Sequence, residues 1–161
     1  MSSQAKNNKT IIVFSSDLDR VLAAFNIAVG AASMGFEVTL YFTFWGLSVL
    51  RRKNLRVTGK SFIDRVFGWM LPVGTEALKL SKMNFLGIGT WMMKKIMKQR
   101  QVALLPELMH TAQESGVQFV ACQMSLDMMG LKLEELIDGV KIGGVAAYLE
   151  AASASDLNLF V

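Results

Sequence analysis

The chain has 161 residues, of which 52% are hydrophobic and 19% are charged, with a net charge of +4 at pH 7. This length predicts one domain, residues 1–161, with a sizeable core, and the high apolar content favours further burial in an oligomer or against a partner. No apolar run reaches the roughly eighteen residues that a membrane-spanning helix needs, and the polar start MSSQAKNNKT lacks the apolar part of a secretory signal.

Apolar runs rich in β-branched and aromatic residues alternate along the chain with segments of helical periodicity. The runs predict strands at residues 9–16, 37–43, 117–121 and 157–161, with a turn or short strand at 138–142. The helical spacing predicts helices at 18–34, 102–115, 131–137 and 143–153. This alternation predicts an α/β fold with a mainly parallel sheet covered by helices.

Residues 51–100 differ from the rest of the chain in charge. They contain twelve Lys or Arg and only two acidic residues, whereas the remaining residues are net acidic. Pro72 and several glycines divide this block into short helices and turns, so we expect an insertion outside the sheet rather than a separate domain. Aromatic residues among lysines favour contact with a membrane surface over nucleic acid, although a solvated face covering an oligomer core has the same pattern.

The cysteine at position 122 is the only one in the chain and follows the apolar run GVQFVA. In a parallel sheet it lies at the carboxyl end of its strand, where open α/β sheets bind ligands. The next residues, Gln123, Ser125 and Asp127, are suited to a helix start, and backbone N–H groups there favour a thiolate. The residue is thus a candidate exposed nucleophile. The alternative is that Cys122 is a small buried hydrophobic residue.

Other chemistry has little support in the sequence. No phosphate-binding glycine motif is present, and one Cys with one His does not make a zinc set, so we expect no cofactor and no metal. His110 lies on the predicted helix before the cysteine strand. Its position favours a surface histidine over a base for Cys122, although a Cys–His pair stays open at this point.

Several stretches resemble the DsrE/DsrF-like family of sulfur-handling proteins, in the larger branch that carries a mid-chain insertion. They are VACQMSLDMMG, which is the most specific, FSSDLDRVLAAFNIAVGAASMG, VTLYFTFWGLSVLR, FGWMLPVG, LSKMNFLGIG and LNLF. The resemblance implies a three-layer α/β/α fold, homo-oligomers and a persulfide on Cys122 that is passed to an acceptor thiol.

Three hypotheses follow for the function. The first is a cytoplasmic sulfurtransferase or sulfur carrier with separate donor and acceptor proteins, because a single cysteine allows no internal relay or disulfide. In this hypothesis Gln123 and Ser125 support the persulfide, and Ser15, Ser16 and Asp17 form the opposite wall of the pocket. The second is a non-catalytic assembly subunit that docks to a membrane or redox partner through residues 51–100. The third is a thiol redox protein.

Overall fold

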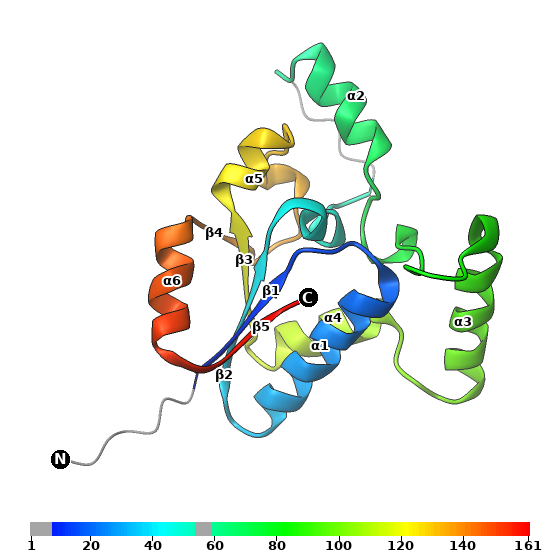
Figure 1. Cartoon of the computed structure of the whole chain (residues 1–161), viewed down its shortest axis with the longest axis horizontal. Coiled ribbons are helices and arrows are strands. Elements are labelled where there is room, and N and C mark those ends of the chain that lie inside the picture. Colours follow the sequence, from blue (N-terminus) through cyan, green and yellow to red (C-terminus); the bar gives the residue numbers. More distant parts are fainter. Residues whose placement is uncertain (1–7, 54–58) are drawn as a thin grey trace.

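The computed structural model describes residues 8–53 and 59–161, and a sheet of parallel strands forms its centre (Figure 1). The strand order is β4-β3-β2-β1-β5, and every neighbouring pair is parallel. The sequence predicted a mainly parallel sheet, and the described sheet is parallel throughout. Its strands are β1 (Asn8–Val13), β2 (Glu37–Phe42), β3 (Gln118–Cys122), β4 (Lys141–Gly143) and β5 (Ser155–Phe160).

Helices cover both faces of the sheet, which confirms the predicted α/β/α layering. Helices α1 (Leu18–Ser33) and α4 (Leu105–Glu114) pack together on one face, and α6 (Val145–Ser153) lies on the other (Figure 1). The core is on the α1 side, where the Phe25 ring lies 6.2 Å from that of Phe42 and 5.7 Å from that of Phe119, between ring centroids. Leucine, valine and alanine side chains from the strands and helices fill the remaining space.

Two predicted helices differ from the structure by more than two residues, for different reasons. The helix expected from residue 102 begins at Leu105, because Pro106 favours the first turn and Glu107 accepts a hydrogen bond of 2.9 Å from the Leu104 N–H. The helix expected over 131–137 is only the 3₁₀ turn η4 (Leu133–Glu135). Its flanking backbone pairs instead with the segment after β2, since the Ile137 N–H donates to the Leu50 carbonyl over 2.9 Å.

The basic block forms an insertion between β2 and α4. A 3₁₀ helix, η1 (Phe44–Leu50), precedes it, and two short 3₁₀ turns, η2 (Thr75–Ala77) and η3 (Phe85–Gly87), lie within it. Its two α-helices, α2 (Phe62–Met70) and α3 (Ile88–Gln99), project beyond the layers of the sheet (Figure 1). Residues 51–60 are basic, polar and poor in apolar residues, a composition that predicts a loop, and residues 54–58 of this stretch lie outside the described residues. Among the helices of the described ranges, none is long and apolar enough to cross a membrane.

Candidate thiol site

Cys122 is the last residue of β3 and the residue before the short helix α5 (Gln123–Met128). Because all the strands are parallel, it lies at their carboxyl edge, as the sequence predicted. The sequence left two alternatives for this residue, an exposed nucleophile and a small buried residue. The exposure expected in the first is wrong, because only 2% of the Cys122 surface is exposed. Helix α5 follows directly, and two neighbouring strands flank the residue, so the thiol lies inside the edge of the sheet rather than on it.

The flanking strands supply the immediate surroundings of the thiol. Cys122 pairs in register with Gly143 of β4, and Ala121 pairs with Phe42 of β2. Side chains alternate along a strand, so Tyr41 and Thr43 share a sheet face with Cys122, opposite the face of the Phe42 core. A Cβ on Gly143 would lie 2.8 Å from a methyl group of Val120, so only glycine fits this close approach beside the cysteine without displacing a neighbour.

Three hydroxyl groups lie beside Cys122, and two of them are hydrogen-bonded to each other. The Tyr41 hydroxyl donates to the Gly143 carbonyl over 2.9 Å, and the hydroxyl oxygens of Thr43 and Ser125 lie 2.8 Å apart. Each hydroxyl has one hydrogen. In the Thr43–Ser125 pair one hydrogen joins the two oxygens, and the other remains free to point at sulfur. The Tyr41 hydrogen serves either the Gly143 carbonyl or the thiolate, one at a time.

These contacts lower the pKa of the Cys122 thiol. Burial alone would raise this pKa, but the donors around the sulfur outweigh it and hold the pKa below its ordinary value. They are, in order of effect, the Ser125 hydroxyl, the Tyr41 hydroxyl, the Ser125 N–H and the Thr43 hydroxyl. The pKa of Tyr41 shifts upward, through burial first and then through its hydrogen bond and charge contact with Cys122. Tyr41 therefore keeps its proton beside the thiolate and acts as a donor.

Of the supporting residues that the sequence predicted, the structure places only Ser125 among the hydroxyl groups beside the thiol. The Ser125 hydroxyl is hydrogen-bonded to that of Thr43 and helps to lower the pKa of Cys122. Gln123 is exposed, and its side-chain amide donates to the Asp127 carboxylate over 2.8 Å. Ser15, Ser16 and Asp17 follow β1, which β2 separates from β3. There the Ser15 hydroxyl accepts a hydrogen bond of 3.0 Å from the Asp17 N–H.

Sequence reasoning missed Tyr41 and Thr43. Both belong to the predicted strand 37–43, and their alternation with Phe42 already puts them on one face. The missing information was which strand neighbours β3. That neighbour is β2, and no local pattern in the sequence specifies this pairing.

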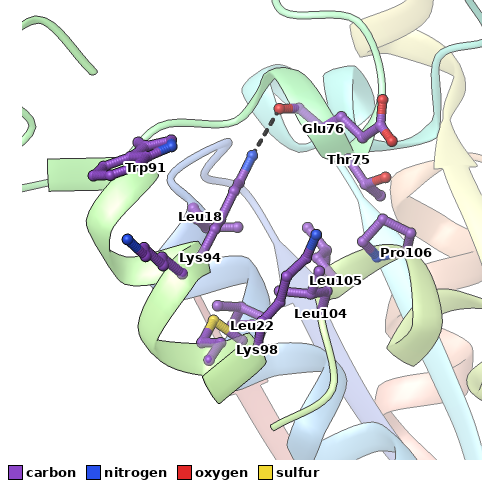
Figure 2. A pocket seen from close by; sticks show the side chains of 12 residues that line it. Leu18, Leu22, Thr75, Glu76, Trp91, Lys94, Lys98, Leu104, Leu105 and Pro106 are labelled. Carbon is purple, nitrogen blue, oxygen red and sulfur yellow. Dashed lines mark hydrogen bonds between the residues drawn. The ribbon is translucent and has the colours of Figure 1, made fainter. Parts of the chain in front are cut away.

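Two other features of the described residues lie apart from the thiol. His110 is exposed on α4, and its Nδ1 lies 3.2 Å from a carboxylate oxygen of Glu114. A cavity of about 440 Å³ opens between α3 and the helices α1 and α4, and Cys122 is not part of its wall (Figure 2). Across residues 8–53 and 59–161, no group of three or more His, Cys, Asp or Glu side chains is placed to hold a metal ion.

A parallel sheet between helices, with a hydrogen-bonded thiol at its carboxyl edge, defines a class of small α/β thiol proteins. Within this class, the chain belongs to the DsrE/DsrF/DrsH-like family, which it matches over residues 6–160. This membership confirms the resemblance found in the sequence.

Two relatives match this chain over nearly its whole length. The uncharacterized protein YrkE of Bacillus subtilis is 46% identical over 161 residues, which is 100% of both chains. The sulfur carrier protein DsrE2 of Allochromatium vinosum is 38% identical over 156 residues, covering 94% of this chain and 96% of the relative.

Solved structures with low sequence identity share the fold. The YchN protein of Escherichia coli superposes with a TM-score of 0.55 at 13% identity, over 96% of this chain and 99% of that chain. The protein MTH1491 of Methanobacterium thermoautotrophicum, a protein of unknown function, gives a TM-score of 0.53 at 14% identity, over 96% and 98%. At such identities the likeness concerns the fold alone.

Proposed function

We propose that this protein is a sulfur carrier that holds a persulfide on Cys122 and passes the sulfane sulfur to an acceptor thiol. The observation that carries the proposal is the hydrogen-bonded environment that lowers the pKa of Cys122. A thiolate is the attacking form in sulfur exchange, so this environment increases the reactive fraction near neutral pH. The name of the Allochromatium vinosum relative, a sulfur carrier protein, supports the same chemistry.

Loading the carrier requires no oxidant. The Cys122 thiolate attacks the terminal sulfur of a donor persulfide, R–S–S–H, and forms a new S–S bond. The donor's own S–S bond breaks and the donor leaves as the thiolate R–S⁻, while the proton stays on the transferred sulfur. Unloading is the same exchange with an acceptor thiolate, and Cys122 then leaves as the stabilised thiolate.

The single cysteine requires that the sulfur donor and the acceptor are other molecules. Because the chain has no second cysteine, both the donor and the acceptor thiol belong to other molecules. A thiol that must remain reduced between cycles fits a reducing compartment such as the cytoplasm. Cys122 is buried, so a donor reaches it through a local opening, and the short helix α5 that covers it is the element we expect to move.

Loading is tested by intact mass after incubation with a low-molecular-weight persulfide donor. Wild type should gain the mass of one sulfur atom, and a reductant should remove it. Cys122→Ser is the matched control and should gain nothing. Failure of wild type to load from several donors, or equal loading of Cys122→Ser, would contradict the proposal.

A second candidate function, assembly, is favoured by helix α2. Its apolar residues cover one side of the helix, and all of them are exposed, Trp69 by 85%. They are Phe62, Ile63, Val66, Phe67, Trp69 and Met70. Exposed apolar patches of this kind mark interaction surfaces.

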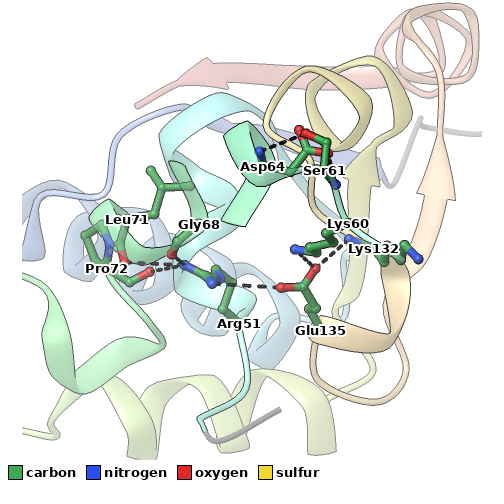
Figure 3. A network of polar contacts seen from close by, with 9 residues as sticks. All are labelled: Arg51, Lys60, Ser61, Asp64, Gly68, Leu71, Pro72, Lys132 and Glu135. Carbon is green, nitrogen blue, oxygen red and sulfur yellow. Dashed lines mark hydrogen bonds and ion pairs between the residues drawn. The ribbon is translucent and has the colours of Figure 1, made fainter. Parts of the chain in front are cut away.

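The opposite side of α2 is fixed to the rest of the molecule by polar contacts (Figure 3). The Arg51 guanidinium donates to the carbonyls of Gly68 over 2.9 Å, and of Leu71 and Pro72 over 3.3 Å. The same guanidinium lies 3.9 Å from the Glu135 carboxylate. These bonds hold the helix with its apolar side outward.

We propose that a second copy of this chain covers the apolar side of α2. The helix has one acidic and one basic residue, Asp64 and Arg65, and lacks the Lys/Arg-rich polar face of helices that bind anionic membranes. Light scattering should show an oligomer for wild type and a smaller particle for the Phe62→Ser/Trp69→Ser variant. Met34→Ser, an exposed apolar residue at the end of α1, is the matched control. An unchanged mass, or binding of wild type to anionic vesicles through α2, would contradict this assignment.

A further inference from the structure

The cavity between α3 and the helices α1 and α4 has the size and lining of a small-molecule site. Ligand cavities in proteins commonly measure about 300–1,000 Å³ and are lined mainly by apolar side chains. This one measures about 440 Å³. Its apolar wall joins the insertion to the helices on the sheet and consists of Leu18, Leu22, Met97, Leu104, Leu105 and Pro106.

One side of helix α3 gives the cavity a cationic rim. Lys94 and Lys95 follow Trp91 by three and four residues, and Lys98 follows Lys94 by four, so the four residues share a side of the helix. All four line the cavity, and Figure 2 shows Trp91, Lys94 and Lys98. The Lys94 ammonium donates to the Glu76 carbonyl over 2.9 Å and has two further hydrogens to donate. The Lys95 ammonium lies 5.1 Å from the centroid of the Trp91 ring.

The acidic residue at the rim does not cancel this charge. Glu76 lines the same cavity, but its carboxylate forms an ion pair with Lys53, outside the cavity wall. Three lysines therefore line the cavity, against one carboxylate that is already paired. A ligand that entered with its charged end at the rim would meet a positive potential there, with apolar side chains deeper inside.

We propose that this cavity binds an organic anion with an apolar body, namely a medium-chain carboxylate. The carboxylate would lie between Lys94 and Lys98, and the chain would lie against the leucines of the wall. Each CH₂ group removed from water adds to the affinity, so the chain supplies most of it, and the lysines decide the sign of the charge that is accepted. The site is independent of Cys122 and of the proposed sulfur transfer.

A ligand in this position would also connect parts of the fold. Only Thr90 and Met97 of α3 are buried, so the helix has little of its own packing against the body. A bound chain would contact α3 on one side and α1 and α4 on the other. We therefore expect ligand binding to raise the melting temperature by linkage, since the ligand binds only the folded chain.

The test uses the full chain and titration calorimetry with three probes below their micelle concentrations: decanoate, decyltrimethylammonium and acetate. Decanoate should bind at one site per chain, and the other two should not, because one has the wrong charge and the other has no apolar body. Absence of decanoate binding at millimolar concentration would overturn the proposal. Equal binding of decyltrimethylammonium would also overturn it, because the rim would then play no part.

Matched variants locate the site. Lys98→Glu should weaken decanoate binding about fivefold or more, as expected for reversing one partly exposed charge at the ligand. Lys82→Glu makes the same change on an exposed lysine of the insertion outside the cavity and should leave binding unchanged. Decanoate should also alter tryptophan fluorescence in Trp69→Phe but much less in Trp91→Phe. Equal effects of the two charge variants, or of the two tryptophan variants, would show that decanoate binds elsewhere, such as the apolar side of α2.

Discussion

The hydroxyl oxygens of Thr43 and Ser125 lie 2.8 Å apart and join the end of β2 to the first turns of α5, beside Cys122. Cys122 is the residue at which β3 ends and α5 starts, so this pair closes the site around the thiol. The pair has one hydrogen more than its mutual bond needs, and that hydrogen is available to a thiolate. The arrangement explains how a buried cysteine has a lowered pKa.

Ser125→Ala removes the side-chain hydrogen bond that lowers the Cys122 pKa most. Without it the thiolate is less stable, so the pKa rises. The pH at which alkylation by iodoacetamide reaches half its maximal rate should increase by about one pH unit, the size expected for one hydrogen bond to a charged group. Ser33→Ala, on the exposed end of α1, is the control. A midpoint that stays in place or falls in Ser125→Ala would contradict the assignment.

Tyr41→Phe should affect both the thiol and the stability of the fold. The substitution removes a donor to the Cys122 thiolate and leaves the Gly143 carbonyl without its partner. We expect a higher alkylation midpoint and a loss of about 1 kcal/mol in the free energy of unfolding, measured in urea. Tyr148→Phe removes a hydroxyl from the ring that packs against Tyr41, 5.2 Å away between centroids, and is the matched control. Equal midpoints in the two variants would show that Tyr41 does not act on the thiol.

Glu135→Gln should be the most destabilising of these changes. The Glu135 carboxylate lies 3.9 Å from the Arg51 guanidinium and forms an ion pair with Lys60, and all three side chains are about nine-tenths buried (Figure 3). Loss of the carboxylate leaves two buried cations unpaired, so we expect about 3 kcal/mol lower stability in urea. The neighbouring exposed Glu134→Gln should change stability by less than about 0.5 kcal/mol. Similar values for the two variants would mean that the cluster does not hold the insertion.

Asp19 should make the start of α1 sensitive to acid. Burial acts to raise the pKa of Asp19, but hydrogen bonds from the Ser81 hydroxyl and N–H, of 2.6 and 2.9 Å, hold it below its ordinary value of 3.8. A pKa that is lower in the folded state stabilises the fold at higher pH, and this stabilisation disappears as the pH falls through the folded pKa. The free energy of unfolding in urea should therefore be higher for wild type than for Asp19→Asn, by up to about 1 kcal/mol at pH 7, because solvent exposure weakens the effect. The difference should be smaller near pH 3. A difference independent of pH would rule out the carboxylate as its cause.

The sequence was informative where the signal is local. The alternation of strands and helices predicted the α/β layers, and the polar residues after GVQFVA correctly placed Cys122 between a strand and a helix. Ser125 could be selected because it is three residues from Cys122 along one chain segment. These features depend on periodicity and on helix starts, which neighbouring residues determine.

The features that sequence reasoning missed depend on pairing across the sheet. Ser15, Ser16 and Asp17 lie at the carboxyl end of β1, which is the reason the sequence favours them as the opposite wall, yet β2 lies between β1 and β3. Tyr41 and Thr43 therefore occupy the flanking positions. The sequence could not decide between an exposed and a buried Cys122, because the burial results from α5 and two neighbouring strands together. The apolar side of α2 points outward because Arg51, which lies outside the helix, holds the opposite side. The periodicity of the helix alone does not specify this orientation.

The most direct test of the proposed carrier is a transfer experiment with persulfide-loaded protein. Chain loaded at Cys122 and freed of donor is mixed with glutathione, and both are analysed by mass. The account predicts that the protein loses one sulfur atom while glutathione persulfide appears in equal amount, and that the unloaded chain is ready for a second cycle. Retention of the sulfur on the protein, or a mixed disulfide between Cys122 and glutathione in place of transfer, would contradict it.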